Sequence, residues 1–202
     1  MAVLLSGTGR TLMNIVDQQR AGKLNSRIEL VIASRPNLVG AQRAVAVGLA
    51  TTVLDRRDFA SVEEHSREIF ARCDQAGVQL VVLAGWLTLL SLPQRYENRV
   101  MNIHPALLPG FGGKGMYGHH VHQAVLDYGC KISGCTVHFV DNSFDHGPII
   151  VQQTCPVLDD DTVETLAARV FEQELIAYPQ AISLFEKGKL KVEGRKVRIA
   201  GP

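Results

Sequence analysis

The chain has 202 residues, 46% of them hydrophobic, and its 21 basic residues nearly balance 20 acidic ones. This length suits one domain, and the balanced charge gives no electrostatic footprint for nucleic acid or an anionic membrane. No apolar run approaches the roughly 18 residues that span a bilayer, and no basic region precedes an apolar stretch, so neither a signal peptide nor a membrane span is expected. The four cysteines form no CxxC pair, which indicates reduced thiols and predicts a cytoplasmic protein.

Short apolar runs alternate with amphipathic stretches in the first half of the chain. Strands are predicted at 2–6, 28–34, 50–55 and 79–85, and helices between them at 10–21, 39–48 and 61–77. Ser61 and Glu64 form a capping-box pattern at the start of the third helix. Strands separated by helices at this spacing predict βαβ units and a parallel sheet.

The rhythm changes after residue 98. Further strands are predicted at 99–104, 135–141 and 148–154, with a helix around 119–129. Only a turn separates the last two strands, which indicates an antiparallel element. A long helix is predicted from Asp161, which forms a second capping box with Glu164, to about Tyr178 before Pro179, and the tail is predicted to form a small hairpin turning at Gly194.

The predicted fold class is therefore α/β. We expect a Rossmann-like, mostly parallel, twisted sheet with helices on both faces, mixed in direction in its C-terminal half and ending in the small hairpin. The whole chain, 1–202, is expected to form one domain with two halves, 1–98 and 99–202.

The stretch "LLSGTGRTL" places two glycines between the first strand and the first helix. Glycines there let the backbone approach a ligand, and the helix N-terminus attracts a phosphate. A dinucleotide fingerprint would need a third glycine at Leu12 and an acidic residue near Ser34, so a nicotinamide cofactor is disfavoured and a lone phosphate is favoured. A tight turn without a ligand remains the alternative.

The stretch "VMNIHP" ends an apolar strand with two polar side chains, Asn102 and His104, which share one face because strand side chains alternate. Such groups need partners, which are either structural or a substrate. Asp145, in a Gly-Pro turn, becomes relevant if the fold brings it beside His104. A carboxylate there would favour imidazolium and raise the histidine pKa towards neutral pH, as general acid catalysis requires.

Three other stretches carry open alternatives. "LAGWLTLLSLP" is predicted to be either an apolar slot for a flat organic ligand or a short buried helix. His119, His120 and His122 lack an Asp, Glu or Cys at ligand spacing, so they are predicted to be polar groups at a helix start, lining a cleft, rather than a metal site. His138, in mid-strand, is predicted to be a half-buried histidine with satisfied hydrogen bonds.

Five segments occur together in one order and spacing: "LLSGTGRTL", "VVLAGWLTLLS", "MNIHPALLP", "SGCTVHFVD" and "FDHGPII". Over essentially the whole chain they resemble the phosphoribosylglycinamide formyltransferase family of folate-dependent formyltransferases. The resemblance implies transfer of a formyl group from 10-formyltetrahydrofolate to the amine of glycinamide ribonucleotide in de novo purine biosynthesis. It implies small-molecule partners only, without metal, nucleic acid or membrane, in a monomer or homodimer.

The resemblance also implies roles for individual residues. Direct attack would pass through a tetrahedral intermediate stabilised by Asn102 and His104, with Asp145 assisting proton transfer. The residues implied to bind the ribonucleotide are Gly9, Arg10, Thr11 and Glu174. The residues implied to bind folate are Leu87, Thr88, Leu89, Leu90 and Asn102.

The chain also departs from the family pattern. Arg10 stands where a small residue is common, Thr88 where an arginine is frequent, and Phe171 where a polar neighbour of the nucleotide is common. The glycine-rich stretch 110–118 is longer than in some relatives and is predicted to be a mobile lid. Rival interpretations are a formyltransferase acting on methionyl-tRNA or a sugar, a deformylase, and a non-catalytic nucleotide-binding module. The end of the chain at residue 202 and its balanced charge disfavour the methionyl-tRNA enzyme, which normally adds a C-terminal nucleic-acid-binding domain. The strand at residue 2 disfavours the deformylase, which normally carries an N-terminal domain.

Overall fold

The computed structural model describes residues 1–201, which form two compact units. The first unit is Met1–Met101, and the second begins at Asn102. This division falls close to the boundary predicted after residue 98, while the assignment of the whole chain to one domain stays a prediction. No helix within the described residues is long and apolar enough to cross a membrane.

The first unit is a parallel α/β sheet. Its strands lie in the order β3-β2-β1-β4, and β1 pairs in parallel with both β2 and β4. The strands are β1 (Ala2–Leu5), β2 (Leu30–Ala33), β3 (Thr51–Val53) and β4 (Val81–Ala84). The helices are α1 (Arg10–Arg20), α2 (Val39–Ala46) and α3 (Val62–Gln75), with short 3-10 turns η1 (Arg56–Asp58) and η2 (Gln94–Tyr96). The predicted βαβ units are confirmed.

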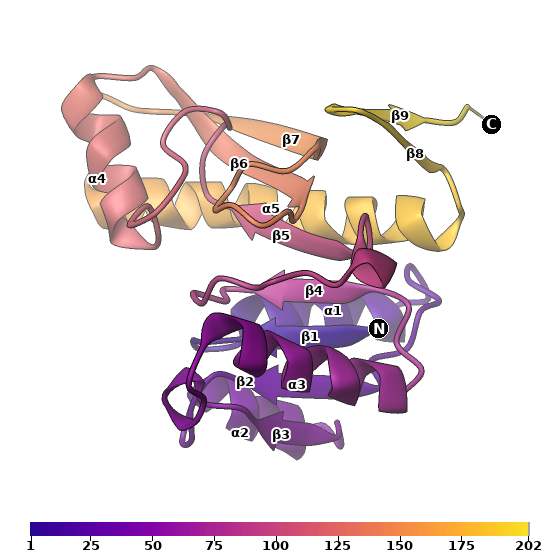
Figure 1. Ribbon diagram of the computed structural model, residues 1–202. Helices are drawn as coiled ribbons and strands as arrows, with labels where there is room; N and C mark the ends of the chain where they lie inside the picture. The colour runs from indigo at the N-terminus through magenta and orange to yellow at the C-terminus, as the bar shows by residue number, and fades with distance from the viewer. Residues whose placement is uncertain (202) are drawn as a thin grey trace. The chain divides into compact units, whose positions relative to one another are not determined.

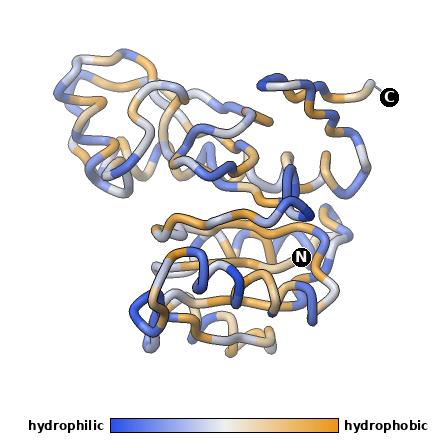
Figure 2. The backbone as a smooth tube through the Cα atoms, in the orientation of Figure 1, coloured by the Kyte–Doolittle hydropathy of each residue, from blue (hydrophilic) through white to orange (hydrophobic). Residues whose placement is uncertain are grey.

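Helices on both faces explain the sequence of the central strands. Figure 1 shows α1 and α3 on opposite sides of the sheet of this unit. All residues of β1 and β4 are buried, and Figure 2 shows hydrophobic residues along these strands. Strands covered on both faces have continuous apolar runs rather than an alternating pattern.

The cap predicted for α3 is present. The Ser61 hydroxyl accepts a hydrogen bond from the backbone N–H of Glu64 at 3.1 Å. The carboxylate of Glu64 accepts from the backbone N–H of Ala60 at 2.9 Å, one residue earlier than a standard capping box.

The second unit is mixed in direction, as predicted. Its strand order is β5-β6-β7-β9-β8; β6 and β7 are antiparallel, and so are β8 and β9. The strands are β5 (Val100–His104), which spans the division between the units, β6 (Ile132–Phe139), β7 (Ile149–Pro156), β8 (Leu190–Glu193) and β9 (Lys196–Ile199). The helices are α4 (His119–Tyr128) and α5 (Val163–Glu186), and α5 packs against β6 and β7 (Figure 1). The predicted α/β class and C-terminal hairpin are confirmed.

Helix α5 differs from the prediction at its start. Its N-cap is Thr162, and the capping box is closed by Thr165 rather than by Glu164. The hydroxyl of Thr162 accepts from the Thr165 N–H at 3.3 Å, and that of Thr165 accepts from the Thr162 N–H at 2.9 Å. Asp161 is not the cap because its carboxylate binds the guanidinium of Arg169, at 2.6 and 2.9 Å.

The predicted end of α5 near Tyr178 is also wrong. The helix continues through Pro179 to Glu186. Proline removes one backbone donor and crowds the preceding turn, which usually kinks or ends a helix. Here the residues on both sides of it, Ala177, Tyr178, Ala181 and Ile182, are fully buried, so packing outweighs the local cost.

Candidate active site

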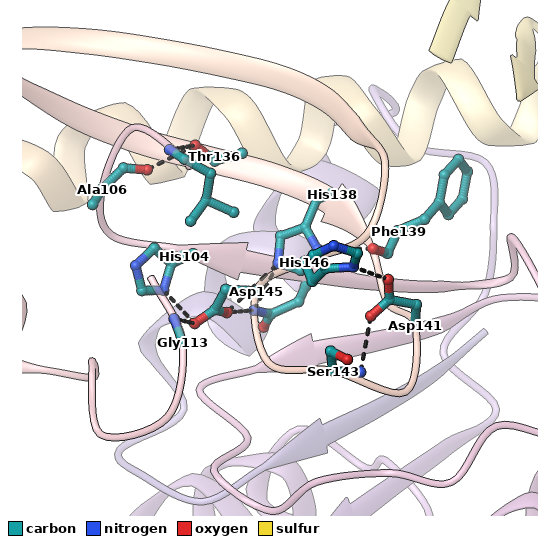
Figure 3. Close-up of polar contacts among 12 residues, drawn as sticks. His104, Ala106, Gly113, Thr136, His138, Phe139, Asp141, Ser143, Asp145 and His146 are labelled. Atoms are coloured by element: carbon teal, nitrogen blue, oxygen red, sulfur yellow. Dashed lines mark hydrogen bonds and ion pairs between the residues drawn. The ribbon is translucent and has the colours of Figure 1, made fainter. Parts of the chain in front are cut away.

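Three polar side chains from two separate segments of the chain meet in the second unit, and Figure 3 shows two of them, His104 and Asp145. Asn102 and His104 lie at the end of β5, and Asp145 lies in the loop between β6 and β7. The amide nitrogen Nδ2 of Asn102 donates to Oδ1 of Asp145 at 3.3 Å. Nδ1 of His104 lies 3.4 Å from Oδ2 of the same carboxylate. The condition that made Asp145 relevant in the sequence, proximity to His104, is therefore met.

The backbone of Asp145 has an unusual conformation, and its carboxylate accepts a hydrogen bond from a neighbouring loop. Asp145 has φ of 52°, in the left-handed region that is uncommon for a non-glycine residue. The backbone N–H of Gly113 donates to Oδ2 at 3.0 Å. Burial raises the pKa of this carboxyl, but the neighbouring His138 and His104 rings and the Gly113 N–H lower it more, so its pKa lies below the usual value. Asp145 is thus a carboxylate at neutral pH.

His104 is buried, and its ring is held on both edges. Nε2 lies 2.8 Å from the carbonyl oxygen of Phe111, so Nε2 carries the hydrogen and donates. Burial lowers the pKa of His104, and although Asp145 and the Phe111 carbonyl raise it, the net pKa is below 6.5. The expected rise towards neutral pH is therefore not observed, because desolvation outweighs the carboxylate.

His138 orients Asn102. Nδ1 of His138 lies 2.8 Å from the carbonyl oxygen of Phe139, which makes Nδ1 the protonated nitrogen. Nε2 is then an acceptor, and Nδ2 of Asn102 donates to it at 3.2 Å. His138 is fully buried rather than half-buried as predicted, while the prediction that both ring nitrogens have partners is confirmed. The sequence did not reveal the link to Asn102, which depends on the pairing of separate strands.

A buried hydroxyl fixes the chain that leaves β5. Thr136 Oγ1 donates to the carbonyl of Ala106 at 2.7 Å and accepts from the backbone N–H of Leu108 at 3.0 Å. Nε2 of Gln152 donates to the same hydroxyl at 3.0 Å and to the Leu108 carbonyl at 3.0 Å. These bonds hold the segment after His104 against β6 and β7. Only the polar residue types of Thr136 and Gln152 in apolar strands signal this network in the sequence.

The loop after β1 in the first unit has the features of a phosphate site. Helix α1 begins at Arg10, after Gly9 with φ of 77°, and has neither a side-chain cap nor an acidic residue in its first turn. A Cβ on Gly9 would lie 2.7 Å from Cα of Gly40 in α2, so only glycine fits. A Cβ on Gly7 would meet no atom within 4 Å. An uncapped helix N-terminus beside an open glycine fits an anion.

The segment after β4 is irregular rather than the short helix that was the alternative prediction. The backbone N–H of Leu87 donates to the hydroxyl of Ser6 at 3.3 Å. The N–H of Ser91 donates to the hydroxyl of Ser66 in α3 at 2.9 Å. Leu87 is 52% exposed whereas Leu90 is buried. An apolar segment fixed at both ends, with one leucine exposed, fits a flat organic ligand.

The remaining candidates differ in burial. His119 and His120, at the start of α4, are exposed, whereas His122 is buried and its pKa is lowered to about 4, chiefly by burial. Among residues 1–201 no group of three or more histidine, cysteine or acidic side chains could hold a metal ion. Glu174 is half-buried on α5, and its charge adds to the burial that raises the pKa of Cys135 to about 12.

Comparison with known proteins identifies the class to which this fold belongs. The family model described as formyl transferase matches residues 1–182. The phosphoribosylglycinamide formyltransferase of Escherichia coli (strain K12) is 36% identical over 203 residues, which cover 100% of this chain and 93% of that protein. The solved structure of glycinamide ribonucleotide transformylase 1 from Symbiobacterium toebii has a TM-score of 0.93 and 40% identity, covering 99% of this chain and 93% of that one.

Some relatives are much longer. The trifunctional purine biosynthetic protein adenosine-3 of Drosophila melanogaster is 40% identical over 192 residues, which cover 93% of this chain but only 14% of that protein. The fold and these comparisons place the chain in the formyl transferase class of proteins. The chain belongs to the formyl transferase family. The resemblance to phosphoribosylglycinamide formyltransferases expected from the sequence is confirmed.

Proposed function

We propose that this protein transfers the formyl group of 10-formyltetrahydrofolate to the amine of glycinamide ribonucleotide, a step of purine biosynthesis. The observation that carries the proposal is the contact of Asn102 and His104 with the Asp145 carboxylate, at 3.3 and 3.4 Å. Amide, imidazole and carboxylate supply the hydrogen-bond donors and the proton acceptor that an acyl transfer needs. The relatives of similar length bear the name of this activity.

Two donors of the chain would stabilise negative charge on the formyl oxygen. The folate donor supplies a formyl carbon that is already activated, so no covalent bond to the protein is required. Asn102 would donate from Nδ2, which His138 and Asp145 orient at 3.2 and 3.3 Å. His104 would donate from Nε2, whose hydrogen is directed at the Phe111 carbonyl 2.8 Å away. The hydrogens of both donors are engaged in the free protein, so each donor would exchange one of these partners for the formyl oxygen, which is the stronger acceptor once it carries negative charge.

Asp145 would carry the proton. The attacking amine must lose a proton, and the departing folate nitrogen must gain one. The lowered pKa of Asp145 keeps the carboxylate ionised and able to accept a proton, directly or through water. The negative charge of Asp145 also raises the pKa of His104, which opposes the effect of burial. This charge would stabilise the His104 ring as a positively charged donor when it takes up a proton.

The binding roles are proposed for each unit separately. In the first unit, Gly9, Arg10 and Thr11 at the N-terminus of α1 would hold the ribonucleotide phosphate, and Leu87, Thr88, Leu89 and Leu90 would line the folate ring. In the second unit, Glu174 would meet the ribonucleotide, and Asn102 would also contact the folate. The uncapped helix start and the fixed apolar segment support these assignments. The absence of an arginine at Thr88 and of a polar group at Phe171 predicts that details of both pockets are specific to this chain.

One assay tests the proposal. Purified protein is mixed with 10-formyltetrahydrofolate and glycinamide ribonucleotide, and the folate product is followed by absorbance. We expect product only when both substrates are present. Equal product without the ribonucleotide would identify a deformylase instead, and ribonucleotide binding without product would identify a non-catalytic module.

A further inference from the structure

The loop that carries Asp145 is tied to the C-terminal hairpin through the residue next to it. His146 follows Asp145, and Arg195 lies in the turn between β8 and β9. Nη2 of Arg195 donates to the backbone carbonyl of His146 at 2.7 Å. Nη1 of Arg195 lies 3.2 Å from Nε2 of the His146 ring. One guanidinium thus binds both the backbone and the side chain of a single residue.

The contacts of the His146 ring define its tautomer. Arginine has no acceptor, so Nε2 must accept from Arg195 and therefore carries no hydrogen. Nδ1 then carries the hydrogen and donates to Oδ2 of Asp141 at 2.6 Å (Figure 3). The other oxygen of Asp141 accepts from the backbone N–H of Ser143 at 2.9 Å. A neutral imidazole therefore bridges a carboxylate at the start of the loop and a guanidinium outside it.

The position of Arg195 is set by the sheet. Lys196, the first residue of β9, pairs with Ile149, the first residue of β7. Because Ile149 directly follows the loop, this pairing brings the hairpin turn beside residue 146. The formyl transferase model matches only residues 1–182, so the hairpin lies outside the part of the chain that defines the family. The hairpin has no other role in the site described above.

From these contacts we propose that Arg195, acting through His146 and Asp141, is a positioning residue for Asp145. Asp145 occupies the left-handed region at φ of 52°, which a non-glycine residue keeps only where its surroundings hold it. Clamping the next residue at its carbonyl and at both ring nitrogens restricts the rotation that would release this conformation. The C-terminal hairpin would thereby keep the carboxylate within reach of His104. This inference rests on the proposed function, in which Asp145 carries the proton.

The effect should be moderate. Arg195 and His146 are exposed, and exposed charged pairs contribute little each. Arg195→Ala should lower kcat roughly three- to tenfold with unchanged KM for either substrate. KM should not change because the binding residues proposed above include neither Arg195 nor His146. Arg195→Lys should recover part of the loss, since one ammonium replaces only part of a fork of donors. His146→Ala combined with Arg195→Ala should be no worse than either change alone.

The matched control is Arg198→Ala in the same hairpin. Arg198 binds the carboxylate of Glu193 within the hairpin, so its removal should leave kcat unchanged. Hydrogen exchange of the peptide covering residues 141–147 gives a readout that does not need activity. We expect faster exchange in Arg195→Ala than in Arg198→Ala, with similar melting temperatures.

The outcomes separate the two proposals. If the unaltered protein transfers no formyl group, the proposed function fails, and the exchange experiment still tests the clamp. Equal exchange in the two hairpin variants would overturn the clamp. Faster exchange with unchanged kcat in Arg195→Ala would show that the loop is held for stability alone and would overturn the positioning role.

Discussion

Oδ2 of Asp145 lies 3.4 Å from Nδ1 of His104, and the pKa of each group is below its ordinary value. The causes differ. For His104, burial outweighs the attraction of the carboxylate; for Asp145, the neighbouring rings and the Gly113 N–H outweigh burial. Both ring nitrogens of His104 face acceptors, the Phe111 carbonyl and the Asp145 carboxylate, and these favour the charged ring, whereas burial opposes it. The protonation of His104 is therefore set by the balance between burial and these two acceptors.

Replacing His104 should remove one oxyanion donor. His104→Ala is expected to lower kcat roughly 10²–10⁴-fold, the usual size of such a contribution, and Asn102→Ala should act similarly. Steady-state kinetics with both substrates measure this. His120→Ala, at an exposed position on α4, is the matched histidine control and should be near normal. Near-normal turnover of His104→Ala would contradict the role of His104 as an oxyanion donor.

Replacing the carboxylate by its amide isolates the role of its charge. Asp145→Asn keeps the shape of the side chain but cannot accept the proton, so kcat should fall roughly 10²–10⁴-fold. Because the Asp145 charge raises the pKa of His104, its loss should lower that pKa further. NMR titration of the His104 ring measures this shift. A higher pKa in the variant would show that the carboxylate does not stabilise imidazolium.

Much of this site follows from local patterns. The alternation of β5 places Asn102 and His104 on one face, and the glycines after β1 mark the loop that we propose to bind phosphate. The pKa direction of His104 was missed because it depends on burial, which a strand pattern does not quantify. The path of α5 through Pro179 was missed because propensity disfavours it and only tertiary packing, around Tyr178, sustains it.

Contacts that depend on how separate segments pack cannot be predicted from sequence patterns either. His138 is unremarkable in a strand, and its partner Asn102 is found only once β5 lies beside β6. Asp141 is unremarkable in a loop, and its partner His146 is found only once that loop folds back between β6 and β7. The N-cap of α5 shows the same limit on a smaller scale. Asp161 and Thr162 are both good caps, and the ion pair of Asp161 with Arg169 decides between them.

Buried histidines should make stability fall in mild acid. The pKa of His122 is about 4 in the folded chain, against 6.5 ordinarily, because burial disfavours its charged form. Between these values the unfolded chain binds a proton that the folded chain does not, so the free energy of unfolding decreases as pH falls. The loss attributable to His122 is roughly 2–3 kcal/mol. His65 and His104 add to it, since burial lowers the pKa of both.

Urea denaturation at pH 7.5 and pH 5 measures this dependence. His122→Leu removes the titrating group and should flatten the profile, while exposed His119→Leu should leave it unchanged. The lowered pKa of Asp145 changes the free energy of unfolding only at pH values near or below the ordinary carboxyl pKa. It therefore does not contribute between pH 7.5 and pH 5. Parallel profiles for His122→Leu and the unaltered protein would contradict the assignment.

Only glycine should be tolerated at position 9, where the loop after β1 contacts α2. Gly9→Ala would place a methyl group 2.7 Å from Cα of Gly40, at φ of 77°, and backbone atoms cannot move aside as a flexible side chain can. The expected cost is roughly 2–4 kcal/mol of unfolding free energy, from overpacking and left-handed strain together. Gly7→Ala, two residues earlier with no atom within 4 Å of the added carbon, should cost little. Urea midpoints for the two variants give the comparison.

The Gly9→Ala variant also tests the proposed phosphate site, because Gly9 precedes the first turn of α1. It should raise KM for the ribonucleotide and leave KM for the folate donor nearly unchanged. An equal rise in both KM values would place the phosphate elsewhere.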